Sequence, residues 1–401
     1  MTIEVAVLAP YFFLAAVACW FGIQSLLNGF RFAAYVKLET RRPLANFCPF
    51  VSVIVPARGL EPGLADNLRS LVEQEYPRYE VLFVFDRADD PAVDFMESLT
   101  QRGFARIVIA GPANESGQKV HNLRVAVTEV APESEVLVFA DTDARPGKDW
   151  LRRLVAPLAD NMIGAVTGYR WFLPVNGGLA SRLRGVWNAS IASALGSDTS
   201  RNFCWGGSTA IRRATFEQLK IREHWRGTVS DDFTISRVLR EAKLPIHFTP
   251  NCLVPSISDC DFKELFEFTT RQIKITRVYS AHLWLPLLLG SALFTLVFFG
   301  GILLLMLQIL SGVLPVVILL TIFVLGATKA FVRWRAVRIP LAAYRQAMNR
   351  DLLAHLLLWP FASLLYLYNA IVAGFSRRIN WRGITYDLKS PSEAVIISRE
   401  P

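Results

Sequence analysis

The chain has 401 residues, of which 52% are hydrophobic and only 19% are charged. These proportions exclude a disordered chain and argue against a purely soluble protein. Lysine and arginine outnumber the acids by 43 to 34, a net charge of +9, which occurs in nucleic-acid binders and also at the cytoplasmic flanks of membrane spans. The five cysteines have no zinc-like spacing, so unpaired, reduced thiols are expected rather than a disulfide framework.

The first long uncharged stretch runs from Val5 to Phe30. It exceeds the roughly 20 apolar residues that cross the hydrocarbon core of a bilayer. Basic residues follow it, at positions 31, 37, 41 and 42, and the positive-inside rule therefore predicts that the chain continues in the cytoplasm. No basic residue precedes the stretch, so residues 1–42 are predicted to form a signal anchor and not a cleaved signal peptide.

Two further apolar stretches lie near the other end of the chain. The stretch 283–328 is about twice too long for a single crossing at ~1.5 Å per residue, and Ser311, Gly312 and Pro315 interrupt it. It is predicted to be a helical hairpin with spans near 283–309 and 313–332. The second stretch, 352–376, is interrupted at Pro360. Residues 283–376 are accordingly predicted to form a membrane block.

The charges of residues 377–401 conflict with a simple topology. Four full crossings from an outside N-terminus would leave this segment outside. Its basic residues, at positions 377, 378, 382 and 389, favour the cytoplasm instead. A re-entrant or interfacial segment broken at Pro360 would remove the conflict, so both topologies remain open for the last stretch.

The middle of the chain, residues 43–260, has the pattern of a soluble α/β domain. Short apolar runs at 51–55, 81–85, 106–110 and 136–140 alternate with segments of helical periodicity. Such runs are typical of strands buried on both faces. The alternation predicts a doubly wound, mostly parallel sheet, in which ligands bind beyond the carboxyl ends of the strands.

Acidic residues stand at those strand ends. Asp141 and Asp143 directly follow the fourth run, and hard oxygen ligands so placed suit Mg²⁺ or Mn²⁺, although aspartate is also common in ordinary turns. Asp86 ends the second run, where a carboxylate can bind a uracil or a ribose, and Asp90 beyond it has the position of a helix cap. Asp231 and Asp232 open a later helical pattern, where one could cap the helix or act as a general base.

The order of motifs resembles a known family. VSVIVPARG, YEVLFVFDRADDPA, KVHNL, FADTD, GGSTAIRR and SDDFTI follow one another between residues 51 and 235, and Trp381-Arg382-Gly383 lies near the end. This order is similar to that of the inverting GT-A glycosyltransferases of family two, and most of all to ceramide glucosyltransferase and its bacterial relatives. The resemblance implies a GT-A domain set between one N-terminal span and a C-terminal membrane block.

The resemblance also implies roles for single residues. Asp232 corresponds to the catalytic base, because the family's base is the second acid of such a pair, and Asp143 would bind the metal ion, Mg²⁺ or Mn²⁺. The nucleotide-binding acid corresponds to Asp90 or Asp86. The donor site as a whole would comprise Arg58, Asp86, Asp90, Lys119, Asn122 and Asp141.

Residues 261–282 are predicted to form an amphipathic segment at the membrane surface. Relatives carry an R/Q-x-x-R-W motif here, but this chain has Lys274 and Ile275 after Arg271. Arg277 is a candidate for the missing cation, so Arg271, Lys274 and Arg277 are expected to bind the acceptor or the leaving diphosphate. The alternative is that these residues are ordinary positive flanks of the next span.

Together these features predict an integral membrane glycosyltransferase with a cytoplasmic catalytic domain. It would transfer a hexose from a UDP-sugar to the hydroxyl of a membrane lipid. A processive polysaccharide synthase and a catalytically silent nucleotide-sugar-binding protein are the alternatives. A nucleic-acid partner is not expected, because the basic residues gather at membrane edges and not on one soluble face. The oligomeric state is not predicted.

Overall fold

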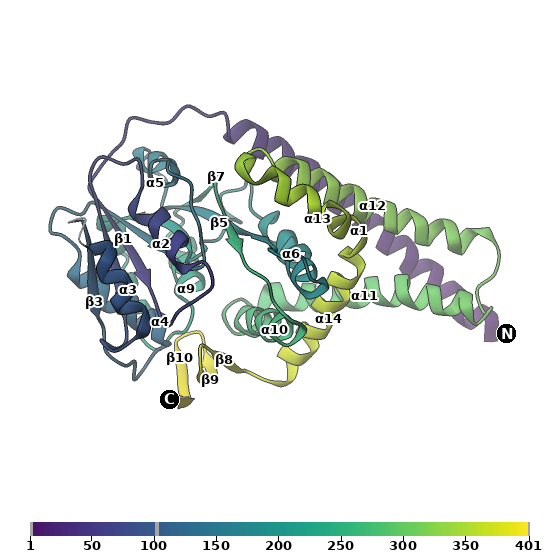
Figure 1. The fold of residues 1–401 in the computed structure, drawn as a ribbon. Helices are drawn as coiled ribbons and strands as arrows, with labels where there is room; N and C mark the ends of the chain where they lie inside the picture. Colours follow the sequence, from purple (N-terminus) through teal and green to yellow (C-terminus); the bar gives the residue numbers. More distant parts are fainter. Residues whose placement is uncertain (1–2, 101–103, 400–401) are drawn as a thin grey trace.

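A computed structural model describes residues 3–100 and 104–399 of the chain. The middle of the chain forms a seven-stranded sheet (Figure 1). The outermost ends of the predicted first and last segments, residues 1–2 and 400–401, lie outside this description. The strand order is β3-β2-β1-β4-β6-β5-β7. The strands are β1 (Val51–Pro56), β2 (Tyr79–Phe85), β3 (Ala105–Ile109), β4 (Val136–Ala140), β5 (Ala165–Leu173), β6 (Ser208–Arg212) and β7 (Ile246–Ile257).

The sheet is mostly parallel, which confirms the predicted fold class. β3, β2, β1 and β4 run parallel to one another, and β5 pairs parallel with β7. β6 runs antiparallel to both of its neighbours, an inversion that the apolar runs did not predict. Because β1, β2 and β4 are parallel, the loops after them meet at one edge of the sheet.

Helices cover both faces of the sheet, each over its own apolar core. One core includes residues of α2 (Leu64–Val72), α3 (Pro91–Thr100) and α5 (Trp150–Val155). The other includes residues of α4 (Gln118–Glu129), α7 (Arg213–Gln218), α8 (Ile221–His224) and α9 (Asp231–Glu241).

The five cysteines are unpaired, as expected.

Three helices of the described chain are long and apolar enough to cross a membrane. α1 (Ile3–Glu39), α11 (Ala281–Met306) and α12 (Val313–Val337) form the elongated arm in Figure 1. The predicted hairpin is therefore present, with its break between residues 306 and 313. α13 (Arg345–Leu357) and α14 (Trp359–Phe375) meet at 70°. This bend lies next to Pro360, where the sequence predicted an interruption.

Two elements connect the arm to the α/β domain. α10 (Phe262–Tyr279) begins at a capping box made by Asp261 and Glu264 and is the predicted amphipathic segment. α6 (Leu179–Ala192) packs with α10 and α14 in a separate apolar cluster. The α/β domain therefore lies beside α10, which is followed directly by α11 of the arm.

The segment after α14 folds into an antiparallel sheet of its own, which we call the tail sheet. Its strands are β8 (Arg378–Trp381), β9 (Ile384–Ser390) and β10 (Glu393–Arg399). The sequence indicated only a basic segment here. Ile379, Ile384 and Leu388 are buried against Val229 and Ile275, so the tail sheet packs on the loop before α9 and on α10.

Candidate active site

A buried lysine joins two of the predicted acids. Asp141 follows β4, Asp231 opens α9, and Lys119 lies in the first turn of α4. The Lys119 ammonium is 2.8 Å from an oxygen of Asp141 and 3.3 Å from an oxygen of Asp231. The second oxygen of Asp231 is buried and has no hydrogen-bond partner among the described residues. Three chain segments thus contribute to one compact charge cluster, which we call the acid cluster.

The charges in the acid cluster shift one another's pKa values. Burial opposes the charged form of Lys119, but the nearby carboxylates outweigh it and raise its pKa above the ordinary value. Burial also opposes ionisation of Asp141, yet Lys119 and Arg170 keep its pKa below the ordinary value. For Asp231 burial prevails, helped by the neighbouring carboxylates, and its pKa rises to about 6. The cluster therefore holds one firmly ionised acid and one that titrates near neutrality.

Two glycines make room for these carboxylates. A Cβ atom on Gly206 would collide with Asp231 and lie 2.8 Å from the Lys119 ammonium. A Cβ atom on Gly207 would lie 2.7 Å from an oxygen of Asp141. Both approaches are closer than ordinary side-chain contacts, and the ring of Trp205 is closer still to the Cβ position of Gly207, so a larger residue at either position would displace its neighbours.

Asp143 points to a second cation, Arg170 of β5. Its Oδ2 lies 3.2 Å from the guanidinium, while its Oδ1 is buried without a partner among the described residues. Burial and the charge of Asp141 raise the pKa of Asp143, although Arg170 opposes this. Arg170 lies over the rings of Trp205 and Phe268. Sequence reasoning missed Arg170, although a charged residue within the apolar run AVTGYRWFL was a usable signal.

Asp232 is adjacent to Asp231 but faces other partners. Its Oδ1 accepts hydrogen bonds from the Ser230 hydroxyl at 2.5 Å and from the Phe233 amide at 2.7 Å. Its Oδ2 accepts none from the described residues. The side chain is only half-buried, and the neighbouring Phe233 ring packs on Tyr279 of α10. Asp232 therefore lies on the side of the site that adjoins α10.

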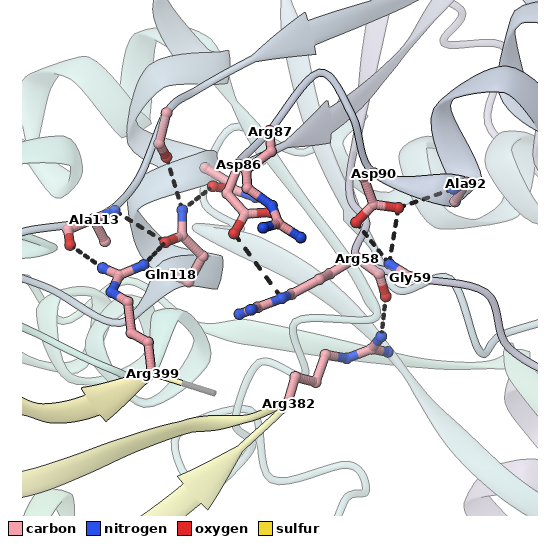
Figure 2. Close-up of polar contacts among 12 residues, drawn as sticks. Arg58, Gly59, Asp86, Arg87, Asp90, Ala92, Ala113, Gln118, Arg382 and Arg399 are labelled. Carbon is pink, nitrogen blue, oxygen red and sulfur yellow. Dashed lines mark hydrogen bonds and ion pairs between the residues drawn. The ribbon is translucent and has the colours of Figure 1, made fainter. Parts of the chain in front are cut away.

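The two acids that follow β2 have different partners (Figure 2). Asp90 accepts hydrogen bonds from the amides of Gly59 and Ala92, so it joins the loop after β1 to the start of α3. Asp86 is 4% exposed, and its Oδ1 has no hydrogen-bond partner among the described residues. Its Oδ2 lies 3.9 Å from the Arg58 guanidinium. Of these two acids, Asp86 is therefore the one that retains a buried oxygen without a partner among the described residues.

Asn122, which the resemblance assigned to the donor site, is tied into the protein. Its amide group donates to the carbonyl of Val84 at 3.2 Å, and its oxygen accepts from Gln118 at 2.8 Å. It is 3% exposed. Asn122 thus supports the end of β2, just before Asp86.

Two of the three cations of α10 contact the tail sheet. Arg271 donates at 3.5 Å to the carbonyl of Asn380 and lies over the ring of Trp381, and Lys274 contacts the same strand. Arg271 is close enough to Arg170 that burial and this like charge lower its pKa to about 10, and its Nε is buried without a partner among the described residues. Lys274 donates at 2.7 Å to the carbonyl of Arg378 in the tail sheet. Arg277 donates to the carbonyl of Ala373 in α14. Only Arg271 faces the acids.

Comparison with known proteins identifies the family. The sequence pattern of glycosyl transferase family 21 matches residues 10–394, almost the whole chain. The chain belongs to glycosyl transferase family 21. This membership confirms the resemblance to the ceramide glucosyltransferases that the order of motifs indicated.

Individual relatives match over shorter lengths. The chain is 30% identical to a β-monoglucosyldiacylglycerol synthase of Trichormus variabilis over 31% of this chain and 27% of that protein. It is 31% identical to the probable glycosyltransferase YdaM of Bacillus subtilis over 30% of this chain and 29% of that protein. The family 21 chain thus spans less than a third of these curated relatives.

Among solved structures, the mannosyltransferase PcManGT of Pyrobaculum calidifontis, in complex with GDP-mannose and Mn²⁺, is similar at 18% identity and a TM-score of 0.46. That likeness covers 90% of this chain and 99% of that one.

Proposed function

We propose that this family 21 glycosyltransferase transfers a hexose from a UDP-sugar to a lipid hydroxyl, with inversion at the anomeric carbon. The observation that carries the proposal is the arrangement of acids along one sheet edge. Asp86 offers a single buried oxygen at one end, and the acid cluster lies at the other. The name of the Trichormus relative, a glucosyldiacylglycerol synthase, supports a lipid as the acceptor.

The nucleoside would bind at Asp86. Uracil presents one N–H donor between two carbonyl acceptors. The free Oδ1 of Asp86 can accept from that N–H, and the Arg58 guanidinium beside it can donate to a carbonyl. In this assignment Asp90 and Asn122 position the two loops and do not touch the donor. This donor–acceptor pattern favours uridine over cytidine, whose ring nitrogen accepts instead of donating.

The diphosphate would lie between Asp141 and α10. The partnerless Oδ1 of Asp143 is a suitable ligand for Mg²⁺ or Mn²⁺, with further oxygens supplied by the diphosphate and water. Such an ion would neutralise charge on the leaving group. Among the described residues no group of three or more His, Cys, Asp or Glu side chains could hold a metal ion alone. Binding of metal and donor is therefore expected to be mutually dependent. Arg271, with its free Nε, would contact the same diphosphate.

Asp232 would act as the general base. Its unbonded oxygen takes the proton of the lipid hydroxyl, and the resulting alkoxide attacks the anomeric carbon as the bond to the diphosphate breaks. The hydrogen bonds from Ser230 and Phe233 fix the carboxylate while leaving that oxygen free. The lipid would approach along α10 from the apolar arm, with the catalytic domain on the cytoplasmic side.

A transfer assay in detergent tests this function. The protein is given several labelled UDP-hexoses, GDP-mannose, and a set of lipids with free hydroxyls, and the products are analysed by mass spectrometry and NMR. We expect a single hexose, β-linked from an α-linked UDP donor, and no product with Asp232→Asn. Polymer formation would favour the processive synthase, and the absence of any glycosylated lipid would contradict the proposal.

A further inference from the structure

The tail sheet touches the donor side of the site as well as α10. Figure 2 shows Arg382 and Arg399 of this sheet beside the residues that surround Asp86. Arg382 donates at 2.6 Å to the carbonyl of Arg58 and also pairs with Glu61. The loop that carries Arg58 is therefore held at two points by one guanidinium.

The last strand, β10, makes similar contacts with the residues just before α4 and at its start. Arg399 donates at 3.2 Å to the side-chain oxygen of Gln118 and also to the carbonyl of Ala113. The Tyr386 hydroxyl accepts a hydrogen bond from the backbone amide of Gln118 at 3.1 Å. Gln118 in turn donates to Asn122, which bonds the end of β2 just before Asp86. The tail sheet thus contacts the loop that carries Arg58 and the loop before α4 that contains Ala113.

The backbone at Arg382 is unusual. Arg382 and Gly383 form the two-residue turn between β8 and β9 and have φ values of 51° and 74°. Turns of this kind favour asparagine, aspartate or glycine at both positions, and a long side chain there carries a conformational cost. An arginine at the first position therefore indicates that its guanidinium contributes something that the turn does not need.

We propose that the tail sheet is part of the donor site and that Arg382 is a positioning residue for Arg58. By holding the Arg58 carbonyl and Glu61, Arg382 fixes the loop from which the Arg58 guanidinium reaches toward Asp86. Its effect is on donor affinity and not on the chemical step, because the acid cluster belongs to other loops. The inference rests on the proposed binding of the donor nucleoside at Asp86.

Arg382→Asn separates this role from a purely structural one. Asparagine tolerates the left-handed backbone, so the turn is expected to remain and the melting temperature to stay equal or rise. Loss of the guanidinium contacts should weaken UDP binding by about five- to tenfold, the effect of one to two hydrogen bonds. Arg382→Lys retains one charged donor group, so its UDP affinity should lie between those of the unmodified protein and Arg382→Asn.

Lys389→Asn is the matched control. It removes the same charge from β9, at the end of the strand far from the turn, where Lys389 pairs with Asp387. UDP affinity is measured by calorimetry in neutral detergent for all four proteins, and kcat at saturating donor is measured alongside. We expect Lys389→Asn to match the unmodified protein, and kcat to change less than twofold in each variant.

The outcomes distinguish this inference from the proposed function. Unchanged UDP affinity in Arg382→Asn, or an equal loss in Lys389→Asn, would overturn the positioning role. A fall in kcat with unchanged affinity would also overturn it. If the unmodified protein binds UDP but glycosylates no lipid, the proposed function fails, whereas a weaker affinity in Arg382→Asn still supports the role of the tail sheet.

Discussion

The sheet edge at which β1, β2 and β4 end has two charged regions, one at Asp86 and one at the acid cluster, and their charges are arranged differently. In the acid cluster, Lys119 lies within 3.3 Å of both Asp141 and Asp231, so the charges compensate one another inside the protein. At the end where we propose that the nucleoside binds, one oxygen of Asp86 has no partner among the described residues, and the cation that pairs with Asp86, Arg58, is 3.9 Å away. Both ends have a buried carboxylate oxygen without a partner among the described residues, but only the acid cluster has a cation in close contact with its carboxylates.

This difference suggests a division of labour. A compensated cluster keeps its geometry while charge moves during a reaction, which is what preorganised electrostatic catalysis requires. An under-bonded site gains contacts when its ligand arrives. Variants at the first end should therefore change the rate or the stability of the fold, and variants at the second should change donor affinity.

Asp232→Asn should give the largest effect. Removal of a general base costs roughly 10²- to 10⁴-fold in rate, and UDP binding should persist because Asp232 is half-buried and lies beside α10, away from Asp86. Single-turnover kinetics and calorimetry on the same preparation measure both quantities. Asp231→Asn is the matched control. If that variant is inactive while Asp232→Asn keeps full activity, the base is the other acid of the pair.

Lys119→Met tests the internal compensation. It would leave Asp141 and Asp231 buried without their shared cation, and breaking a buried ion pair in this way typically costs about 3–5 kcal/mol. We expect a marked fall in melting temperature together with loss of activity. A variant as stable as the unmodified protein would show that the acids are not held by Lys119.

Asp143→Ala should weaken donor binding only where a metal ion takes part. The partnerless Oδ1 is the proposed ligand, so UDP affinity measured with Mn²⁺ should fall by about tenfold or more, as for loss of a charged contact. Affinity measured in EDTA should change little. Unchanged affinity in Mn²⁺ would remove Asp143 from the metal site.

The raised pKa of Asp231 predicts a pH dependence of stability. Its pKa is about 6 in the folded protein against about 3.9 in an unfolded chain, so the folded state binds the proton more tightly. This contribution is fully present below pH 3.9 and is lost as the pH rises through 6. The melting temperature of the unmodified protein, relative to Asp231→Asn, should therefore fall between pH 4 and pH 7. A constant difference would contradict the shift.

The sequence predicted the parallel half of the sheet well, because strands buried on both faces read as continuous apolar runs. VSVIV, VLFVF and VLVFA lie within β1, β2 and β4. Helix α3 begins at Pro91, beside the predicted cap Asp90. Asp86 directly follows β2 and Asp141 directly follows β4, so both lie at the edge where these parallel strands end.

Long-range contacts could not be predicted in the same way. The antiparallel β6 depends on pairing with strands distant in sequence, which local periodicity does not encode. The strands of the tail sheet pair locally, but their packing on Val229 and Ile275 is a long-range contact. The different partners of Asp86 and Asp90 depend on where the Gly59 amide lies. The link from Arg382 to Arg58 spans most of the chain. A positive φ at an arginine cannot be recognised before the hairpin is known.

Lys274→Ala should have the smallest effect, and it tests whether the two regions are linked. Lys274 does not face the acids but donates to the Arg378 carbonyl, so it holds the tail sheet whose far end holds the Arg58 loop. A partly exposed hydrogen bond of this kind contributes about 1 kcal/mol or less, so UDP affinity should fall about twofold to threefold, with kcat unchanged. Because both residues would act through one tail sheet, the double variant with Arg382→Asn should be little weaker than Arg382→Asn alone. Fully multiplicative losses would mean that α10 and the Arg58 loop are independent, and a fall in kcat would place Lys274 at the diphosphate instead.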